Sequence, residues 1–136
     1  NNAIESMVRL MAFFDNVVHS INKIALFELE RFYPEAYKRF CDSIIKKDVE
    51  AIKNSINQGI KEGFFREGID VDFSARLRVE MSFMILRPYF FSVSNQNLTK
   101  LSNGVADHFI YGILTPKGEK LYHKYKEQYI KKVTVL

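Results

Sequence analysis

Apolar residues recur at three- and four-residue steps along most of the chain, which is the period of an amphipathic α-helix. Near the N-terminus, for example, Ile4, Met7, Met11 and Phe14 fall on one face. Glycine, proline or polar clusters interrupt this pattern and divide the chain into helices. We expect helices at residues 3–18, 22–32, 34–62, 72–91 and 98–114, with a last helix that begins at Pro116. The predicted fold class is therefore all-α, a single domain with about six helices.

The helix at 34–62 is the longest, and the corner that follows it contains stop and start signals. At about 1.5 Å per residue it spans roughly 40 Å, so the other helices must pack along it. Gly63 can adopt the left-handed conformation that ends a helix. Asp72 is positioned to accept hydrogen bonds from the first free N–H groups of the next helix, which predicts it as the N-cap.

The helix at 72–91 lacks a polar face, because most positions from Leu77 to Leu86 are apolar. A helix that is apolar on all sides is buried on both sides. Either a partner subunit covers its second side, or it is the central helix of one subunit. The first alternative predicts a homodimer of four-helix-bundle type, in which Phe109→Asp separates the subunits. The expected interface residues are Leu77, Met81, Met84, Leu98, Leu101, Val105, Phe109 and Ile113.

Large aromatic residues are abundant, with twelve Phe and seven Tyr. They indicate either a closed apolar core or an apolar cavity between the first four helices, and composition does not separate the two. Arg76 and Glu80 have the spacing of a local ion pair, whereas Arg87 has no such acid and either binds an anion or points into solvent. The candidate residues for a ligand cavity are Phe13, Phe14, Phe27, Tyr37, Phe40, Cys41, Phe83 and Arg87.

Candidate chemistry for an enzyme is missing from the sequence. The three histidines lie in separate segments without zinc-site spacing, and the single cysteine, Cys41, lies on an apolar stripe. We therefore expect no catalytic site, no metal and no cofactor. The longest apolar block ends at Leu86, too short to span a membrane, and one cysteine fits a reducing compartment, so we expect a cytoplasmic protein.

The net charge of +4 comes from the last segment, residues 117–136, which holds six lysines against two glutamates. Outside that segment the acidic and basic side chains balance. A nucleic-acid-binding face would place its basic residues along the docking element. Binding of this chain to DNA is therefore expected to be weak, independent of sequence and sensitive to salt.

Three short motifs follow one another over about half of the chain. The first is Gly59, Ile60, Glu62, Gly63, Phe64 and Arg66; the second is Ile69, Asp70, Asp72, Ala75, Arg76 and Leu77; the third is Gly112, Ile113, Thr115, Pro116, Lys117 and Gly118. In order and spacing they resemble the C-terminal regulatory domain of TetR-type transcriptional regulators. The family's N-terminal helix-turn-helix, about fifty residues, has no counterpart in these 136 residues.

The resemblance implies an effector-binding and dimerisation domain. Its partners would be a second copy of the chain, a small and mainly apolar effector, and operator DNA bound only through the missing helix-turn-helix. The alternative is a free-standing all-helical module that binds another protein and has no small-molecule ligand.

Overall fold

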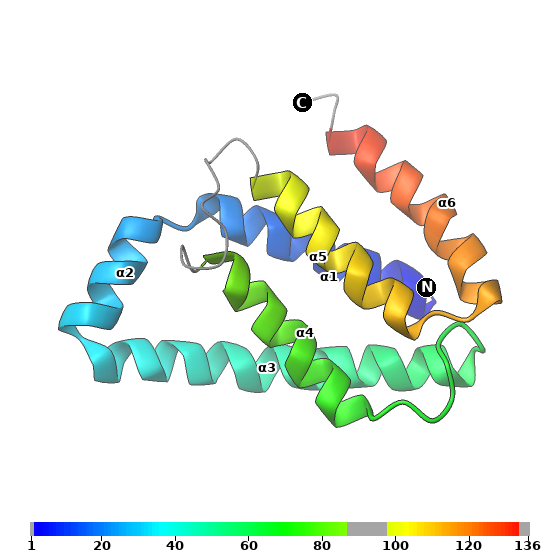
Figure 1. Ribbon diagram of the computed structural model, residues 1–136, viewed down its shortest axis with the longest axis horizontal. Helices are drawn as coiled ribbons and strands as arrows, with labels where there is room; N and C mark the ends of the chain where they lie inside the picture. Colours follow the sequence, from blue (N-terminus) through cyan, green and yellow to red (C-terminus); the bar gives the residue numbers. More distant parts are fainter. Residues whose placement is uncertain (1, 87–97, 134–136) are drawn as a thin grey trace.

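The computed structural model describes residues 2–86 and 98–133, and these residues form six α-helices (Figure 1). The all-α prediction is confirmed, and each described helix end lies within two residues of its expected place. The expected end of the fourth helix at residue 91 and the polar segment 92–97 lie outside the described residues. The helices are α1 (Ala3–Ser20), α2 (Lys23–Phe32), α3 (Pro34–Lys61), α4 (Val71–Leu86), α5 (Leu98–Ile113) and α6 (Pro116–Val133).

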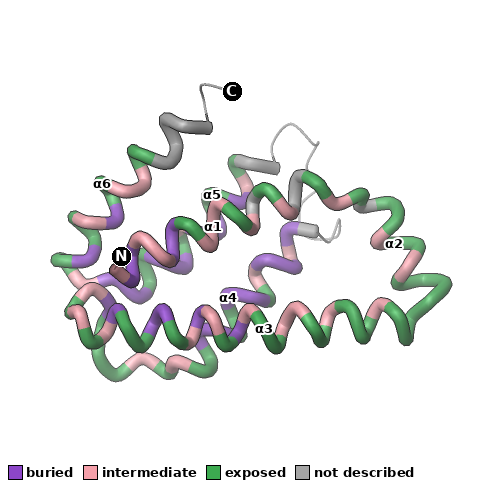
Figure 2. Tube along the Cα trace, turned by 180° about the vertical axis from the view of Figure 1, so that it is seen from behind, coloured by how far each residue is buried: buried purple, intermediate pink, exposed green. Residues whose placement is uncertain are grey.

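Helix α3 is the longest element, with 28 residues and therefore a length of about 42 Å. Pro34 occupies its first turn, where the missing N–H costs nothing. In Figure 1 α3 extends along one side of the molecule, and α4 crosses it. Only the second half of α3 is buried, from Val49 to Gly59, while its first half and α2 are largely exposed (Figure 2).

The main core lies where the second half of α3 meets α1, α4, α5 and α6. Phe65, in the segment between α3 and α4, is among the largest side chains that are fully buried. Helix α2 contributes no buried residue within its described side chains. The core residues include Ile4, Met7, Ile52, Ile56, Phe65, Val79, Phe83, Phe109, Ile110, Ile113 and Tyr122.

The end of α3 is fastened to the α5–α6 junction by backbone hydrogen bonds, in a contact that we call the clasp (residues Gly59–Arg66 and Gly112–Gly118). Arg66 N donates to Ile113 O at 2.8 Å, and Thr115 N donates to Phe64 O at 2.9 Å. Phe65 and Leu114 form an isolated antiparallel bridge between these two bonds. Polar groups that the helix ends leave unpaired are thereby satisfied across the clasp.

Side chains of the clasp reinforce the same contact. The Thr115 hydroxyl donates to Gly63 O at 2.7 Å and accepts from Gly118 N at 3.1 Å, so Thr115 caps α6. The Arg66 guanidinium donates to Gly112 O, with an Nε–O distance of 3.0 Å. Lys117 Nζ donates to Glu62 O at 3.1 Å.

The start of α1 is attached to the same corner. The Glu62 carboxylate accepts from Ala3 N at 2.9 Å, and the Asn2 amide donates to the Tyr125 hydroxyl at 3.0 Å. Four helices, α1, α3, α5 and α6, therefore have an end at this corner, on the right of Figure 1. The turn itself needs Gly63, whose φ of 77° lies in the left-handed region that favours glycine, as the sequence predicts.

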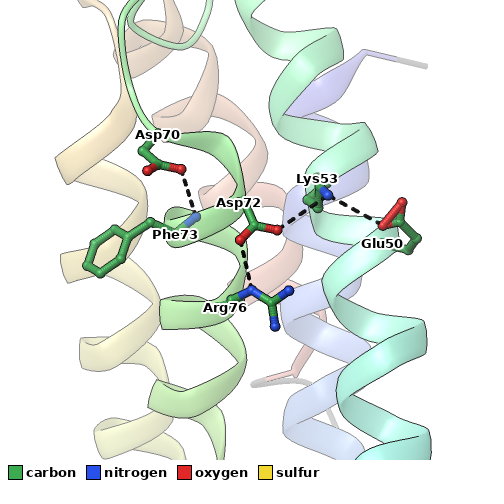
Figure 3. A network of polar contacts seen from close by, with 6 residues as sticks. All are labelled: Glu50, Lys53, Asp70, Asp72, Phe73 and Arg76. Carbon is green, nitrogen blue, oxygen red and sulfur yellow. Dashed lines mark hydrogen bonds and ion pairs between the residues drawn. The ribbon is translucent and has the colours of Figure 1, made fainter.

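The N-cap of α4 is Asp70, so the prediction that Asp72 caps this helix is wrong. Asp70 Oδ1 accepts from Phe73 N at 3.0 Å (Figure 3). Asp72 lies in the first turn and pairs with Arg76 at 2.8 Å and with Lys53 of α3 at 3.4 Å. The hydrogen bond from Arg76 lowers the pKa of Asp72. Arg76 thus pairs with Asp72, four residues before it, and not with Glu80.

The clasp predicts a strong effect of a methyl group at Gly118. A Cβ there would lie 2.1 Å from the Phe64 carbonyl oxygen, so the α5–α6 junction must move away. We expect Gly118→Ala to lower the free energy of unfolding, measured in urea, by about 1–3 kcal/mol. Gly112→Ala is the control, since nothing lies within 4 Å of its Cβ position. It should unfold within about 0.5 kcal/mol of the wild type or be more stable, and an equal loss in both variants would contradict the clasp.

Candidate functional site

Helix α4 buries polar residues beside its apolar core residues and leaves other apolar residues outside. Ser74, Arg78 and Ser82, spaced four residues apart, are buried and form what we call the inner stripe. Phe73 and Leu77 are exposed, and Met81 and Met84 are half-buried; these four form the outer stripe. One apolar side of α4 faces outward from this subunit, so the alternative that α4 is buried on both sides within one subunit is wrong. That a partner subunit covers this side stays a prediction.

Arg78 is the central residue of the inner stripe and is 6% exposed. Its Nη1 donates to Ser82 Oγ at 2.6 Å. The rings of Phe14 from α1 and Phe109 from α5 each lie 5.9 Å from the guanidinium carbon, within the range of cation–π attraction. Burial lowers the pKa of Arg78 to about 10, so the side chain remains charged at neutral pH.

Among the side chains that the structure describes, none forms an ion pair with Arg78. Its electrostatic neighbour is Tyr122, whose hydroxyl donates to Asp107. Asp107 is also paired with Lys126, so its charge is already balanced. Burial, followed by the hydrogen bond to Asp107, raises the pKa of Tyr122 and keeps it neutral. The inner stripe therefore holds a buried positive charge without a negative counterpart from these groups.

The outer stripe continues into an open hollow of about 560 Å³ between α4 and α5. Its walls are mainly apolar, and Gly104 leaves open space, since nothing lies within 4 Å of its Cβ position. The lining residues are Met81, Met84, Lys100, Leu101, Gly104, Val105 and His108. A surface of this kind can receive side chains of a second helix pair.

The eight residues expected at a dimer interface divide into two groups. Leu77 is 41% exposed, and Met81, Met84 and Leu101 are half-buried around the hollow. Val105, Phe109 and Ile113 are buried within the subunit itself. Leu98 begins α5, and its side chain lies outside the described part. The stripe on α5 therefore turns from the outer surface at Leu101 into the subunit's own core at Phe109 and Ile113.

The eight residues expected around a ligand cavity are not gathered around either hollow found here. Phe13, Phe27 and Phe40 are exposed, and Phe14, Tyr37 and Cys41 are half-buried. Phe83 belongs to the main core, and Arg87 lies outside the described residues. Phe14 is the member that lies beside the inner stripe. The cavity between the first four helices stays a prediction.

A second open hollow, of about 510 Å³, lies on α2 and is lined by Ala25, Glu28, Leu29, Phe32 and Tyr33. Large exposed apolar side chains also occur on α1, α2 and the first half of α3. They are Phe13, Ile24, Phe27, Phe32, Tyr33 and Phe40. The molecule therefore presents two separate apolar surfaces, one on the outer stripe and one on α2.

Sequence reasoning missed the inner stripe. The signal for the stripe was present, since Ser74, Arg78 and Ser82 are polar at positions i, i+4 and i+8 of one helix. Within residues 2–86 and 98–133 no group of three or more His, Cys, Asp or Glu side chains is arranged to hold a metal. In the same ranges, no helix has the length and apolar character needed to cross a bilayer.

The burial of Phe109 changes the expected effect of Phe109→Asp. The side chain is 6% exposed and packs in the subunit's own core, so a carboxylate there should unfold the subunit rather than separate a dimer. We expect a loss of more than about 3 kcal/mol in urea unfolding followed by circular dichroism. Phe73→Asp, on the outer stripe, is the matched control and should retain the helical spectrum. A folded Phe109→Asp monomer would contradict this assignment.

Comparison of the chain with family models, with curated proteins and with solved structures found no match. The resemblance to TetR-type regulators therefore rests on the three motifs and on the order of the helices. The structure adds the positions of those motif residues: the first and third form the clasp, and the second forms the start of α4.

Proposed function

We propose that this chain is the effector-binding and dimerisation domain of a TetR-like transcriptional regulator, whose DNA-binding helix-turn-helix lies outside these 136 residues. The observation that supports it best is the clasp. Arg66 of the first motif and Gly112 of the third lie 46 residues apart in the chain and are joined by a hydrogen bond. If the three motifs reflect a fold shared with the family, residues of separate motifs are expected to meet in space, as those of the first and third motifs do in the clasp.

The proposed dimer surface is the outer stripe of α4 together with the adjoining hollow on α5. Phe73 and Leu77 are exposed in the subunit, and burying such side chains is the main driving force for association. A second copy would place its own α4 and α5 against this surface, and Gly104 would permit a close approach. The resulting four-helix arrangement is expected to cross near 20° and to bury more than about 1,000 Å² in total.

An effector would act through the helices that join the two halves of the regulator. Effector binding would favour one arrangement of these helices and so change the separation of two DNA-binding heads. In this chain α1, α3, α5 and α6 have an end at the clasp corner, where hydrogen bonds connect them. A shift of one of these helices would therefore displace the others.

The second candidate is a helical interaction module that binds another protein. It is favoured by the exposed apolar surface on α2, where Ile24, Phe27 and Phe32 are accessible. In this case α2, and not the outer stripe of α4, would be the functional surface.

Light scattering at micromolar concentration tests the proposal directly. We expect a dimer for the wild type and a monomer for Leu77→Glu, because the substitution places two charges in an apolar contact. Phe32→Glu is the matched control: it changes another large, exposed apolar side chain on the other surface, and the dimer should persist. A monomeric wild type, or a dimer separated by Phe32→Glu alone, would contradict the proposed interface.

Binding to DNA is expected to be weak for these 136 residues, because the basic excess is confined to residues 117–136. In a fluorescence-anisotropy titration, the affinity should be equal for unrelated duplexes. It should fall about tenfold or more when the salt concentration rises from about 50 to about 200 mM, as is general for contacts to phosphates. Sequence-specific binding would show that this part of the chain itself contains a reading element, against the proposal.

A further inference from the structure

The hollow between α4 and α5 combines an apolar lining with two basic side chains. Its apolar residues belong to a small cluster around the buried Ile85 and Val105. Lys100, Gly104 and His108 also line it, and since they follow one another at steps of four residues, they share one side of α5. Lys100 and His108 are both exposed in the subunit. The surface that the proposed dimer would cover therefore includes a lysine and a histidine, one on each side of Gly104.

The two basic side chains would respond differently to a covering subunit. A lysine carries its charge at the end of a long flexible chain, so it can keep the ammonium group in water at the rim of an apolar contact. A histidine ring lies close to its helix and stays within the contact. Histidine is also the side chain whose charge ordinarily changes between about pH 5 and about pH 8. His108 is therefore the described residue of the hollow whose protonation can change the charge of a covered surface near neutral pH.

The α4 side of the hollow offers His108 no acidic partner among the lining residues that the structure describes. Met81 and Met84 form this side and are uncharged. Glu80, just before Met81, is exposed and does not belong to the described lining. In sequence, the connection between α4 and α5 at residues 87–97 contains no Asp or Glu, and its one charged residue is an arginine.

The charged and titratable groups on the other neighbouring elements lie outside the described lining as well. Asp107 of α5 is paired with Lys126 of α6. Tyr111, further along α5, shares a hydrogen bond of 2.6 Å with His123 of α6. On α1, the side chain of Asp15 lies outside the described part of the chain. A proton on the histidine of the hollow would thus add a positive charge to a described lining that is otherwise apolar, apart from one lysine.

We infer that His108 makes dimerisation of this chain depend on pH, with the dimer favoured while the imidazole is neutral. Because the regulated surface is the dimer surface of the proposed function, this inference rests on that function. In a two-fold interface each copy contributes the same residues, so both His108 rings are covered together. Covering an imidazolium with apolar groups removes its hydration, and Lys100 of the same hollow carries a charge of the same sign.

Protons favour the free subunit in this arrangement. The covered imidazole binds a proton less readily than the exposed imidazole of the free subunit, so dissociation of the dimer is accompanied by proton uptake. The dimer should therefore be tightest at about pH 8 and should weaken as the pH falls through the ordinary range of histidine. Since each dimer covers two rings, the dissociation constant should rise about tenfold or more between about pH 8 and about pH 5.5.

Sedimentation equilibrium at these two pH values tests the inference. The dissociation constant of the wild-type dimer should rise about tenfold or more at the lower pH. His108→Gln keeps a polar side chain of similar size without the titration, and its dissociation constant should be the same at both pH values. His123→Gln is the matched control, because His123 is an exposed histidine on α6 outside the described lining of the hollow, and this variant should keep the wild-type pH dependence.

The outcomes separate the regulation from the dimer itself. A wild-type dimer with the same dissociation constant at both pH values would overturn the inference and leave the proposed interface intact. The same holds if His108→Gln keeps the pH dependence, or if His123→Gln alone removes it. A monomeric wild type at both pH values would overturn the proposed interface and the inference with it. Circular dichroism should show the same helical signal at both pH values, and dissociation that accompanies unfolding would overturn the inference.

Discussion

The clasp between Gly59–Arg66 and Gly112–Gly118 is the contact on which the arrangement of the helices depends. It pairs backbone groups that the ends of α3 and α5 would otherwise leave unsatisfied. Such an approach of two backbones is possible only where side chains are absent: a Cβ at Gly59 would lie 2.1 Å from the Phe65 ring, and one at Gly118 equally close to Phe64 O. Phe65 is fully buried beneath the clasp. The clasp therefore fixes the directions of α4 and α6 relative to the core.

The orientation of α4 has two energetic costs. Its inner face buries Ser74, Arg78 and Ser82, and its outer face exposes Phe73 and Leu77. The same orientation buries Ala75, Val79 and Phe83 in the core, and these apolar contacts oppose the two costs. The links of Asp72 to Lys53 of α3, and of Asp70 to the first turn, hold the helix in this orientation (Figure 3). Local rules of patterning are broken most often at functional sites, and the exposed apolar face of α4 is the surface that the proposed dimer would use.

Much of the fold could be predicted because its signals are local. Helix bounds follow from apolar spacing together with Pro34, Gly63 and Pro116, whose effects on the backbone do not depend on distant residues. The N-cap of α4 was missed because Asp70 and Asp72 are both within reach of the first turn. The path of the preceding segment, fixed by the clasp, decides between them.

The sequence by itself determined the all-helical class, the order of six helices and the residues of the turns between them. The tertiary structure alone decided which sides of α4 and α5 face inward. In α4 nearly every second position is apolar, so periodicity does not indicate a direction. In α5 the four-residue steps from Leu101 to Ile113 each advance the direction by about 40°, because a turn has 3.6 residues. The stripe therefore rotates from the outer hollow at Leu101 into the core at Phe109 and Ile113. Which of its residues face the hollow and which face the core depends on how α5 packs against α1 and α4.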